Sequence, residues 1–372
     1  MEQMHSMINV GIIGLGFGTQ VILPALRRNQ RFNVISVAGS GHRTRSKNFS
    51  LIGDGVKVTS VRDILSTKQI QAVVVAVPPI AQEGLIVQSI LAGKNVLCEK
   101  PFTASRNQAM RVCKFAHRKK LLLAVDYEFR YDALLTLCHS AISNGCLGTV
   151  RAVKVCWFSG GSLRNDRLWS WRDDIRYSGG VLTEWCSHII DYVPRLCDSQ
   201  FKSISCKLRT DVESRLDLEG RSVPVTSPDG CTLQASLCNG VKVSVDVSTA
   251  RDVRHGHYID IRGSRGSLKA RMTPPYTLSS LSYSITTENN EATNYLAPTG
   301  EGEDSIDTRL EAVASLSADF ASAIDSSVKA QSLPICQDAI VAWEVMLAAR
   351  MSSEKDGEEV AINPDILSTS SS

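Results

Sequence analysis

The sequence predicts an α/β protein in which a doubly wound parallel sheet precedes a domain with a mostly antiparallel, open-faced sheet. Three observations support this. In the first third of the 372 residues, short apolar runs alternate with helical patterns. A glycine-rich turn follows the first apolar run. Beyond residue 127, apolar and polar residues alternate singly, as in strands with one buried face. We expect domains at residues 7–127 and 128–366, with disordered tails at 1–6 and 367–372.

The first domain is predicted from apolar runs typical of strands that are buried on both faces. These runs are "NVGIIGLG", "FNVISVAG", "AVVVAV", "NVLCEK" and "LLLAVDY". Helical patterns lie between them at residues 20–29, 81–92 and 105–118, and the last opens on "SRNQ", which has the spacing of a capping box. Strands and helices in this order form crossover units, so the sheet is expected to be parallel.

The second domain is predicted to begin with a helix at residues 133–144. Period-2 strands follow in "VRAVKVCWFS", "KSISCKL", "CTLQASL", "VKVSVDVS" and "YIDIRGSRGSLKA". The polar stretches at residues 213–230 and 286–307 are interpreted as loops. Helical patterns at residues 308–324 and 337–352 are expected to close the domain.

Composition excludes several classes of protein. The charged fraction of 21% and the hydrophobic fraction of 43% are ordinary for a globular chain. A net charge of +3 without a basic arm argues against nucleic-acid binding. The apolar run at residues 72–81 is too short to cross a bilayer, and the N-terminus lacks the pattern of a secretory signal. Eleven scattered cysteines without a Cys-x-x-Cys pair indicate a reducing compartment and no zinc site. We expect a cytoplasmic protein without a metal.

The turn "GLGFG" predicts a dinucleotide site because it follows the first strand and opens the first helix. Gly14 permits the tight turn, and Gly16 lets the backbone approach a pyrophosphate at the helix N-terminus. The third position of the fingerprint is Thr19, with Gly18 one place early.

The end of the second strand favours NADP(H) over NAD(H). NAD sites usually place an acidic residue there, but this chain has none between Glu2 and Asp54. The strand ends instead in "AGSGHRTRSK", where Ser40, His42 and Arg43 could bind a 2′-phosphate. The alternative is a solvated basic helix start, which leaves NAD(H) open.

The stretch "NVLCEKPFT" ends a buried strand with charged residues. The carboxyl edge of a doubly wound sheet is where ligands bind, so Glu99 and Lys100 are expected beside the nicotinamide. Pro101 would fix the turn, and Lys100 could donate to a developing alkoxide. The alternative is an ordinary Lys-Pro surface turn.

A helix is expected after Gly180, in "VLTEWCSHIIDYVPRL". Helical spacing puts Glu184, His188 and Asp191 on one stripe at the border of its apolar face. Glu184 lies one turn from His188 and could orient the imidazole. The alternative is a histidine whose hydrogen bonds are satisfied at a domain boundary.

Over nearly its whole length the chain resembles the Gfo/Idh/MocA oxidoreductase family. The resemblance depends on "VGIIGLGFG", "EKP", "WRDD" before a glycine pair, "GGVLTEWCSHIID", "GSRGSL" and "LPICQDAIVAWEVMLAA", in that order. It implies reversible oxidation of a secondary hydroxyl on a sugar, cyclitol or sugar derivative. It also implies that Lys100 borders both nicotinamide and substrate, and that relatives pair as homodimers or homotetramers through the second sheet.

The resemblance and the motifs together give a candidate site. The catalytic candidates are His188 as general base, Lys100 and Glu184. The substrate-binding candidates are Asp191, Trp169 and Arg176. The cofactor-binding candidates are Gly14, Gly16, Phe17, Gly18, Ser40, His42, Arg43, Val77, Pro78, Glu99, Lys100, Trp171 and Arg172.

Three departures from the family pattern open an alternative. Glu184 stands where many relatives have aspartate, and Cys186 where they have glycine. "VPPIAQ" replaces Thr-Pro-Asn-x-x-His, so Pro79 and Gln82 occupy two of its positions. A catalytically inactive cofactor-binding sensor or regulatory protein of the same fold is the alternative to an enzyme.

Overall fold

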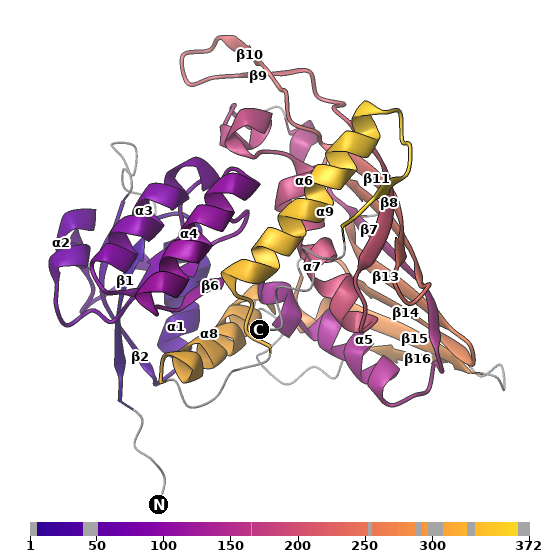
Figure 1. The fold of residues 1–372 in the computed structure, drawn as a ribbon, viewed down its shortest axis with the longest axis horizontal. Coiled ribbons are helices and arrows are strands. Elements are labelled where there is room, and N and C mark those ends of the chain that lie inside the picture. Colours follow the sequence, from indigo (N-terminus) through magenta and orange to yellow (C-terminus); the bar gives the residue numbers. More distant parts are fainter. Residues whose placement is uncertain are drawn as a thin grey trace, which may run out of the picture. The chain divides into compact units, whose positions relative to one another are not determined.

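The structure is a computed structural model that describes residues 6–39, 51–164, 166–251, 255–274, 276–287, 292–296, 308–325 and 332–363. It divides into two compact units (Figure 1). The first is Met1–Tyr131 with Arg309–Ile340, and the second is Asp132–Thr308 with Val341–Ser372. The first unit therefore extends past residue 127 and takes in a segment from late in the sequence.

The first unit contains a parallel sheet, as the sequence predicts. Its six described strands lie in the order β3-β2-β1-β4-β5-β6, and every neighbouring pair is parallel. They are β1 (Ile8–Ile13), β2 (Phe32–Ala38), β3 (Lys57–Thr59), β4 (Ala72–Val75), β5 (Asn95–Cys98) and β6 (Leu123–Val125).

Helices lie between these strands in crossover units, and one short helix follows β6. They are the π-helix η1 (Gly18–Ile22), α1 (Leu23–Arg28), α2 (Val61–Ser66), α3 (Pro79–Leu91), α4 (Arg106–Lys119) and the 3₁₀ helix η3 (Glu128–Tyr131). The expected cap of α4 is present, since the Ser105 side chain accepts a hydrogen bond from Gln108 N. Figure 1 shows α3 and α4 side by side in front of the sheet.

A late helix, α8 (Thr308–Ile324), completes the core of the first unit. Its buried residues Val313, Leu316 and Phe320 pack with the apolar side chains of β1, β2 and α1. Phe320 stacks on Phe32 of β2, with ring centroids 6.5 Å apart. Burial of this apolar face explains why the segment belongs to the first unit rather than to the second.

The second unit contains a large mixed sheet. Its described strands lie in the order β16-β15-β14-β13-β7-β12-β11-β8-β17, and every neighbouring pair is antiparallel except β7 with β12. They are β7 (Val150–Phe158), β8 (Phe201–Arg209), β11 (Gly230–Leu237), β12 (Lys242–Ser248), β13 (Gly256–Gly263), β14 (Gly266–Met272), β15 (Leu281–Thr287), β16 (Ala292–Leu296) and β17 (Val360–Ala361).

The helices of the second unit include α5 (Ala133–Ser143), α6 (Val181–Glu184) and α7 (Cys186–Leu196). Another helix, α9 (Cys336–Glu354), begins in the first unit and continues into the second. Its serines accept hydrogen bonds from β8: Cys206 N donates to Ser352 Oγ and Leu208 N to Ser353 Oγ.

The sheet of the second unit has one buried and one polar face. On β11, Leu233 and Ala235 are buried, whereas Thr232 and Gln234 between them are exposed. This alternation confirms the mostly antiparallel, open-faced sheet predicted from period-2 patterns.

Two sequence-based interpretations were wrong in detail. The stretch at residues 213–230 was expected to be a loop but contains a hairpin of β9 (Ser214–Leu216) and β10 (Ser222–Pro224), which Figure 1 shows at the top of the view. The second supposed loop contains β16. Within the described ranges, no helix has the length and apolar character needed to cross a membrane.

Candidate active site

The glycine turn of the first unit has the geometry of a dinucleotide-binding turn. Gly14 has a φ of +126°, and a Cβ there would lie 2.0 Å from the carbonyl oxygen of Ala76. A Cβ on Gly16 would meet nothing within 4 Å, so open space lies beside its backbone. A Cβ on Gly18 would lie 2.9 Å from Ile12 Cγ2, which indicates helix–strand packing rather than ligand contact.

These positions fit a nicotinamide dinucleotide, because one glycine forms the turn, another leaves room for a pyrophosphate and the third allows close packing. Phe17 is the N-cap residue of η1, and the guanidinium of Arg309 lies 5.9 Å from its ring centroid. The predicted 2′-phosphate residues Ser40, His42 and Arg43 lie outside the described residues.

The turn after β5 is held by a buried glutamine. Gln82 of α3 is fully buried, and its Nε2 donates to the carbonyl oxygens of Val77 and Glu99, at 3.1 and 3.0 Å. Its Oε1 accepts from Thr103 N at 2.6 Å. The residue that departs from the family pattern therefore fixes both ends of the segment around Lys100.

Pro78 is the N-cap residue of α3, directly after Val77, and the Lys100–Pro101 peptide bond is cis. Sequence reasoning singled out Gln82 only as a departure from relatives. Its role depends on a three-way contact that spacing does not reveal.

The carboxyl group of Glu99 is buried. Burial, reinforced by the charge of Glu128, raises the pKa of Glu99 to about 7, despite the opposing effect of Lys100. This electrostatic environment lies at the carboxyl ends of β5 and β6, beside Lys100.

In the second unit, the helix expected after Gly180 is broken at Trp185, which has a φ of −112° and separates α6 from α7. Glu184 is thus the last residue of α6, while His188 lies in the first turn of α7. The Glu184 carboxylate accepts a hydrogen bond from Arg172 Nε at 2.8 Å. The break and this ion pair replace the continuous helical stripe that the sequence predicts.

His188 lies in an aromatic cluster. Its residue is 2% exposed, and its ring centroid is 6.3 Å from that of Trp157 on β7. Trp157 also contacts Trp185 and stacks on His257 of β13, at 4.4 and 4.6 Å.

His257 is part of the same cluster, since the Tyr192 hydroxyl lies 2.9 Å from His257 Nε2. Burial lowers the pKa of His257 to about 3, so this imidazole is neutral at physiological pH. Sequence reasoning missed Trp157, Tyr192 and His257. The sequence did contain an indication of this cluster, because each of two strands has an aromatic residue on its buried face. The register of β7 and β13 pairs these residues, Trp157 with His257.

A cavity of about 450 Å³ lies within the second unit. Glu184, Trp185 and Arg172 line one part of it, and Asp191 is buried on the adjoining helix α7. Its other charged lining residues are Arg164, Asp166, Arg167, Asp173, Arg215 and Asp229.

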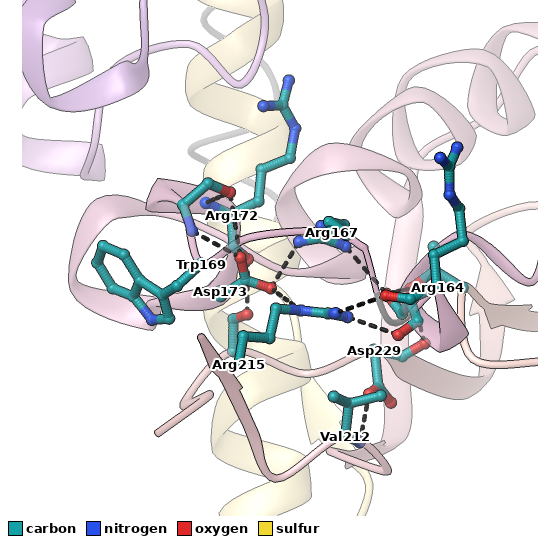
Figure 2. A network of polar contacts seen from close by, with 12 residues as sticks. Arg164, Arg167, Trp169, Arg172, Asp173, Val212, Arg215 and Asp229 are labelled. Carbon is teal, nitrogen blue, oxygen red and sulfur yellow. Dashed lines mark hydrogen bonds and ion pairs between the residues drawn. The ribbon is translucent and has the colours of Figure 1, made fainter. Parts of the chain in front are cut away.

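The four arginines of this cavity are each paired with a carboxylate of its lining. Figure 2 shows Asp173 between Arg167 and Arg215, whose nitrogens lie 2.5 and 2.9 Å from its Oδ1. Arg164 pairs with Asp166, and Arg172 pairs with Glu184. Arg215 comes from the β9–β10 hairpin, is almost fully buried and also donates to the Ser162 carbonyl oxygen at 2.5 Å.

The carboxylate of Asp229 accepts the backbone N–H groups of Asp211 and Val212, both at 2.9 Å. In Figure 2 the guanidinium groups of Arg164 and Arg172 point away from Asp173. The lining thus carries four guanidinium groups and four carboxylates, and its formal charge is balanced.

Two predicted substrate residues do not line this cavity. The indole Nε1 of Trp169 donates to the Pro224 carbonyl oxygen at 3.3 Å, and Figure 2 shows its ring to one side of the arginine cluster. Arg176 pairs with Asp174, and its side chain is 78% exposed. Trp171 lies under the Arg172 guanidinium, 4.5 Å from the ring centroid. Within the described ranges, no group of three or more His, Cys, Asp or Glu side chains could hold a metal ion.

Comparison with known proteins agrees with this geometry. Residues 8–127 match the oxidoreductase family with an NAD-binding Rossmann fold, and residues 136–269 match the GFO/IDH/MocA C-terminal domain. Glucose-6-phosphate 3-dehydrogenase of Bacillus subtilis is 25% identical over 275 residues, which cover 73% of this chain and 76% of that protein.

Solved structures share the fold. A levoglucosan dehydrogenase in complex with NADH and L-sorbose superposes with a TM-score of 0.82 at 18% identity, covering 96% of this chain and 99% of the other. A super-repressor mutant of Gal80p from Saccharomyces cerevisiae superposes with a TM-score of 0.80 at 18% identity, covering 96% and 98%.

The predicted fold class, family and oxidoreductase activity with a nicotinamide cofactor are confirmed. The chain belongs to the Gfo/Idh/MocA family of oxidoreductases.

Proposed function

We propose that the protein reversibly oxidises a secondary hydroxyl group of an uncharged sugar, cyclitol or related polyol, with NADP(H) as the preferred cofactor. The observation that carries the substrate class is the charge-balanced cavity of the second unit. Its paired arginines and carboxylates offer many donors and acceptors for hydroxyl groups. A phosphate would have to break existing ion pairs to gain a counter-ion, which costs desolvation and pairing energy.

In the proposed mechanism, His188 and Lys100 act together with the bound nicotinamide. The bound nicotinamide supplies hydride acceptance and donation. His188 accepts the hydroxyl proton during oxidation and returns it in the reverse direction. Lys100 stabilises the negative charge that develops on the oxygen.

Neighbouring residues would support these groups. The aromatic cluster around Trp157 packs beside the His188 ring, with the ring centroids of Trp157 and His188 6.3 Å apart. Asp191 is assigned to substrate hydroxyls. Glu184 holds Arg172 at the cavity wall, and its assignment as the residue that orients His188 stays a prediction.

A substrate panel tests the proposal. Uncharged sugars, inositols, sugar phosphates and nucleotide sugars are incubated with each oxidised cofactor, and the keto forms with each reduced one. We expect turnover with an uncharged polyol that is lost in His188→Ala. Turnover confined to sugar phosphates would contradict the substrate class, and turnover unchanged in His188→Ala would contradict the assigned base.

The NADP(H) preference depends on the absence of an acidic residue at the end of the second strand and on the basic stretch that follows it. Titration with each reduced cofactor, followed by nicotinamide fluorescence, tests it. We expect tighter binding of NADPH, and a greater loss of NADPH than of NADH binding in Arg43→Ala. Tighter binding of NADH to the wild type would contradict this part of the proposal.

A second candidate function is a cofactor-bound sensor. The fold likeness to Gal80p and the departures at Glu184, Cys186 and Gln82 favour it. Retention of both Lys100 and His188 favours the enzyme, because a sensor has no chemical need for this pair. NADPH binding without turnover across the panel, together with a partner protein that is retained only in the presence of the cofactor, would identify the sensor.

A further inference from the structure

Three acidic side chains of the first unit are buried where two neighbouring strands end. Cys98 of β5 is in register with Val125 of β6, and Asp126 N donates to the Cys98 carbonyl oxygen at 2.8 Å. Glu99 and Asp126 therefore follow at corresponding positions, and Glu128 opens η3 just beyond. The exposed fractions of Glu99, Asp126 and Glu128 are 8%, 0% and 4%.

Glu99 and Asp126 need a proton to contact each other favourably. Their carboxyl groups follow paired strand ends and are close enough to interact, yet two carboxylates bring only acceptors. Neither Asp126 oxygen receives an N–H or O–H from the described protein, and both oxygens are buried. A buried carboxylate without a donor is costly, so one of the two groups must carry a hydrogen.

The charges around the three carboxyl groups also favour one retained proton. Among the residues that the structure describes, the groups that interact electrostatically with the cluster are the Cys98 thiol, the Lys100 ammonium and the Arg309 guanidinium. Three ionised carboxylates would exceed these two cations by one negative charge in a buried place. One retained proton balances the charge.

We propose that Glu99, Asp126 and Glu128 form a carboxyl cluster that retains a proton in the folded protein and positions Lys100 through its charge. With the proton in place, two carboxylates balance Lys100 and Arg309. Loss of the proton adds a negative charge beside Lys100 and weakens the positive potential it offers to a substrate alkoxide. No member of the cluster is assigned a contact with substrate. Glu99 is a predicted cofactor contact, and Asp126 and Glu128 are positioning residues. The effect on turnover rests on the proposed function.

The titration behaviour of the cluster agrees with this assignment. Burial, with the charge of Asp126, raises the pKa of Glu128 to about 8, and burial with the charge of Glu99 also raises the pKa of Asp126. Unfolded carboxyl groups have a pKa of about 4. The folded protein thus binds more protons than the unfolded chain. The resulting stabilisation is complete below about pH 4 and is lost as the pH rises through the folded values of about 7 and about 8.

Asp126→Asn is the decisive variant, because the amide supplies an N–H donor to Glu99 and makes the retained proton unnecessary. Glu128→Gln is a second variant that tests the same cluster. Glu83→Gln is the control: it removes a carboxyl group of the first unit that pairs with Arg111 on the surface of α3 and α4.

The first measurement needs neither cofactor nor substrate. Infrared spectra at pH 7 should show a protonated-carboxyl band in the wild type and in Glu83→Gln, reduced in Asp126→Asn. The urea midpoint of the wild type should fall between about pH 4 and about pH 8, and less so in Asp126→Asn and Glu128→Gln. Equal bands in wild type and Asp126→Asn, or parallel pH dependences of the midpoint, would overturn proton retention.

The second measurement concerns Lys100. The alkaline limb of kcat should move to higher pH by about one unit in Asp126→Asn, whereas Glu83→Gln should keep the wild-type profile. An unmoved limb in a folded Asp126→Asn protein would overturn the positioning role. Absence of turnover in the wild type would overturn that role together with the proposed function, while the infrared band alone would still decide whether the proton is retained.

Discussion

Gly14 and Gly16 are two positions of one turn, but the structure gives them different physical tasks. Gly14 needs a positive φ and a close approach to the Ala76 carbonyl, whereas Gly16 borders open space. The sequence predicted both glycines from the fingerprint. Only the structure separates the residue required for folding from the residue required for the ligand.

Alanine substitutions at these two glycines should therefore affect different properties. Gly14→Ala should change the stability of the fold, and Gly16→Ala should change the binding of the cofactor. We expect Gly14→Ala to lower the free energy of unfolding by about 2 kcal/mol or more, because the side chain meets backbone at a φ that L-residues avoid. Gly16→Ala should change it by less than about 1 kcal/mol, yet weaken cofactor binding, since its methyl group occupies ligand space. Urea unfolding and fluorescence titration check both. Normal binding in a stable Gly16→Ala protein would contradict the assigned pyrophosphate site.

Some contacts of individual residues could not be predicted from the sequence. Asp126 and Glu128 follow directly after an apolar run, which could have indicated acids at the ligand edge of the sheet. Their mutual contact with Glu99 could not be predicted, because it depends on the register of β5 and β6. The roles of Gln82 and His257 depend in the same way on partners distant in sequence.

At the scale of elements, β1, β2, β4, β5 and β6 and the helices α1, α3 and α4 of the first unit were predictable because their periodicity is local. The short elements β3 and α2 were not predicted. The β9–β10 hairpin was not predictable, since each strand has three residues and its composition is polar. Arg215 anchors the hairpin. Its guanidinium can be buried because it donates hydrogen bonds to the Asp173 carboxylate and to the Ser162 carbonyl oxygen. The break at Trp185 similarly interrupts an apolar pattern that runs on without a glycine or proline at that point.

The hairpin anchor gives an element-scale prediction. Arg215→Met should lower the free energy of unfolding by about 1–3 kcal/mol, because it leaves buried acceptors without their donor. Arg176→Met removes an arginine with an exposed side chain from a similar carboxylate pair and should lower the free energy of unfolding less than Arg215→Met does. Chemical unfolding of both variants provides the measurement. Equal losses would show that burial does not distinguish the two ion pairs.

At the scale of the whole molecule, assembly through the open sheet face remains a prediction. That face carries polar side chains such as Thr232 and Gln234, so it does not have the composition of an apolar patch. The expectation of a dimer or tetramer depends instead on the family resemblance. Light scattering at micromolar concentration should give a multiple of 40.5 kDa. A mass equal to the single chain would contradict it.

The central claim is that Lys100 takes part in hydride-transfer chemistry rather than in folding or cofactor binding alone. Lys100→Ala tests it most directly, with Lys114→Ala, an exposed lysine of α4, as the matched control. We predict that kcat falls by about two decades or more in Lys100→Ala, because a charged donor to the developing alkoxide is lost. Its affinity for the cofactor should stay close to that of the wild type. A turnover number equal to that of the Lys114→Ala control would contradict the account.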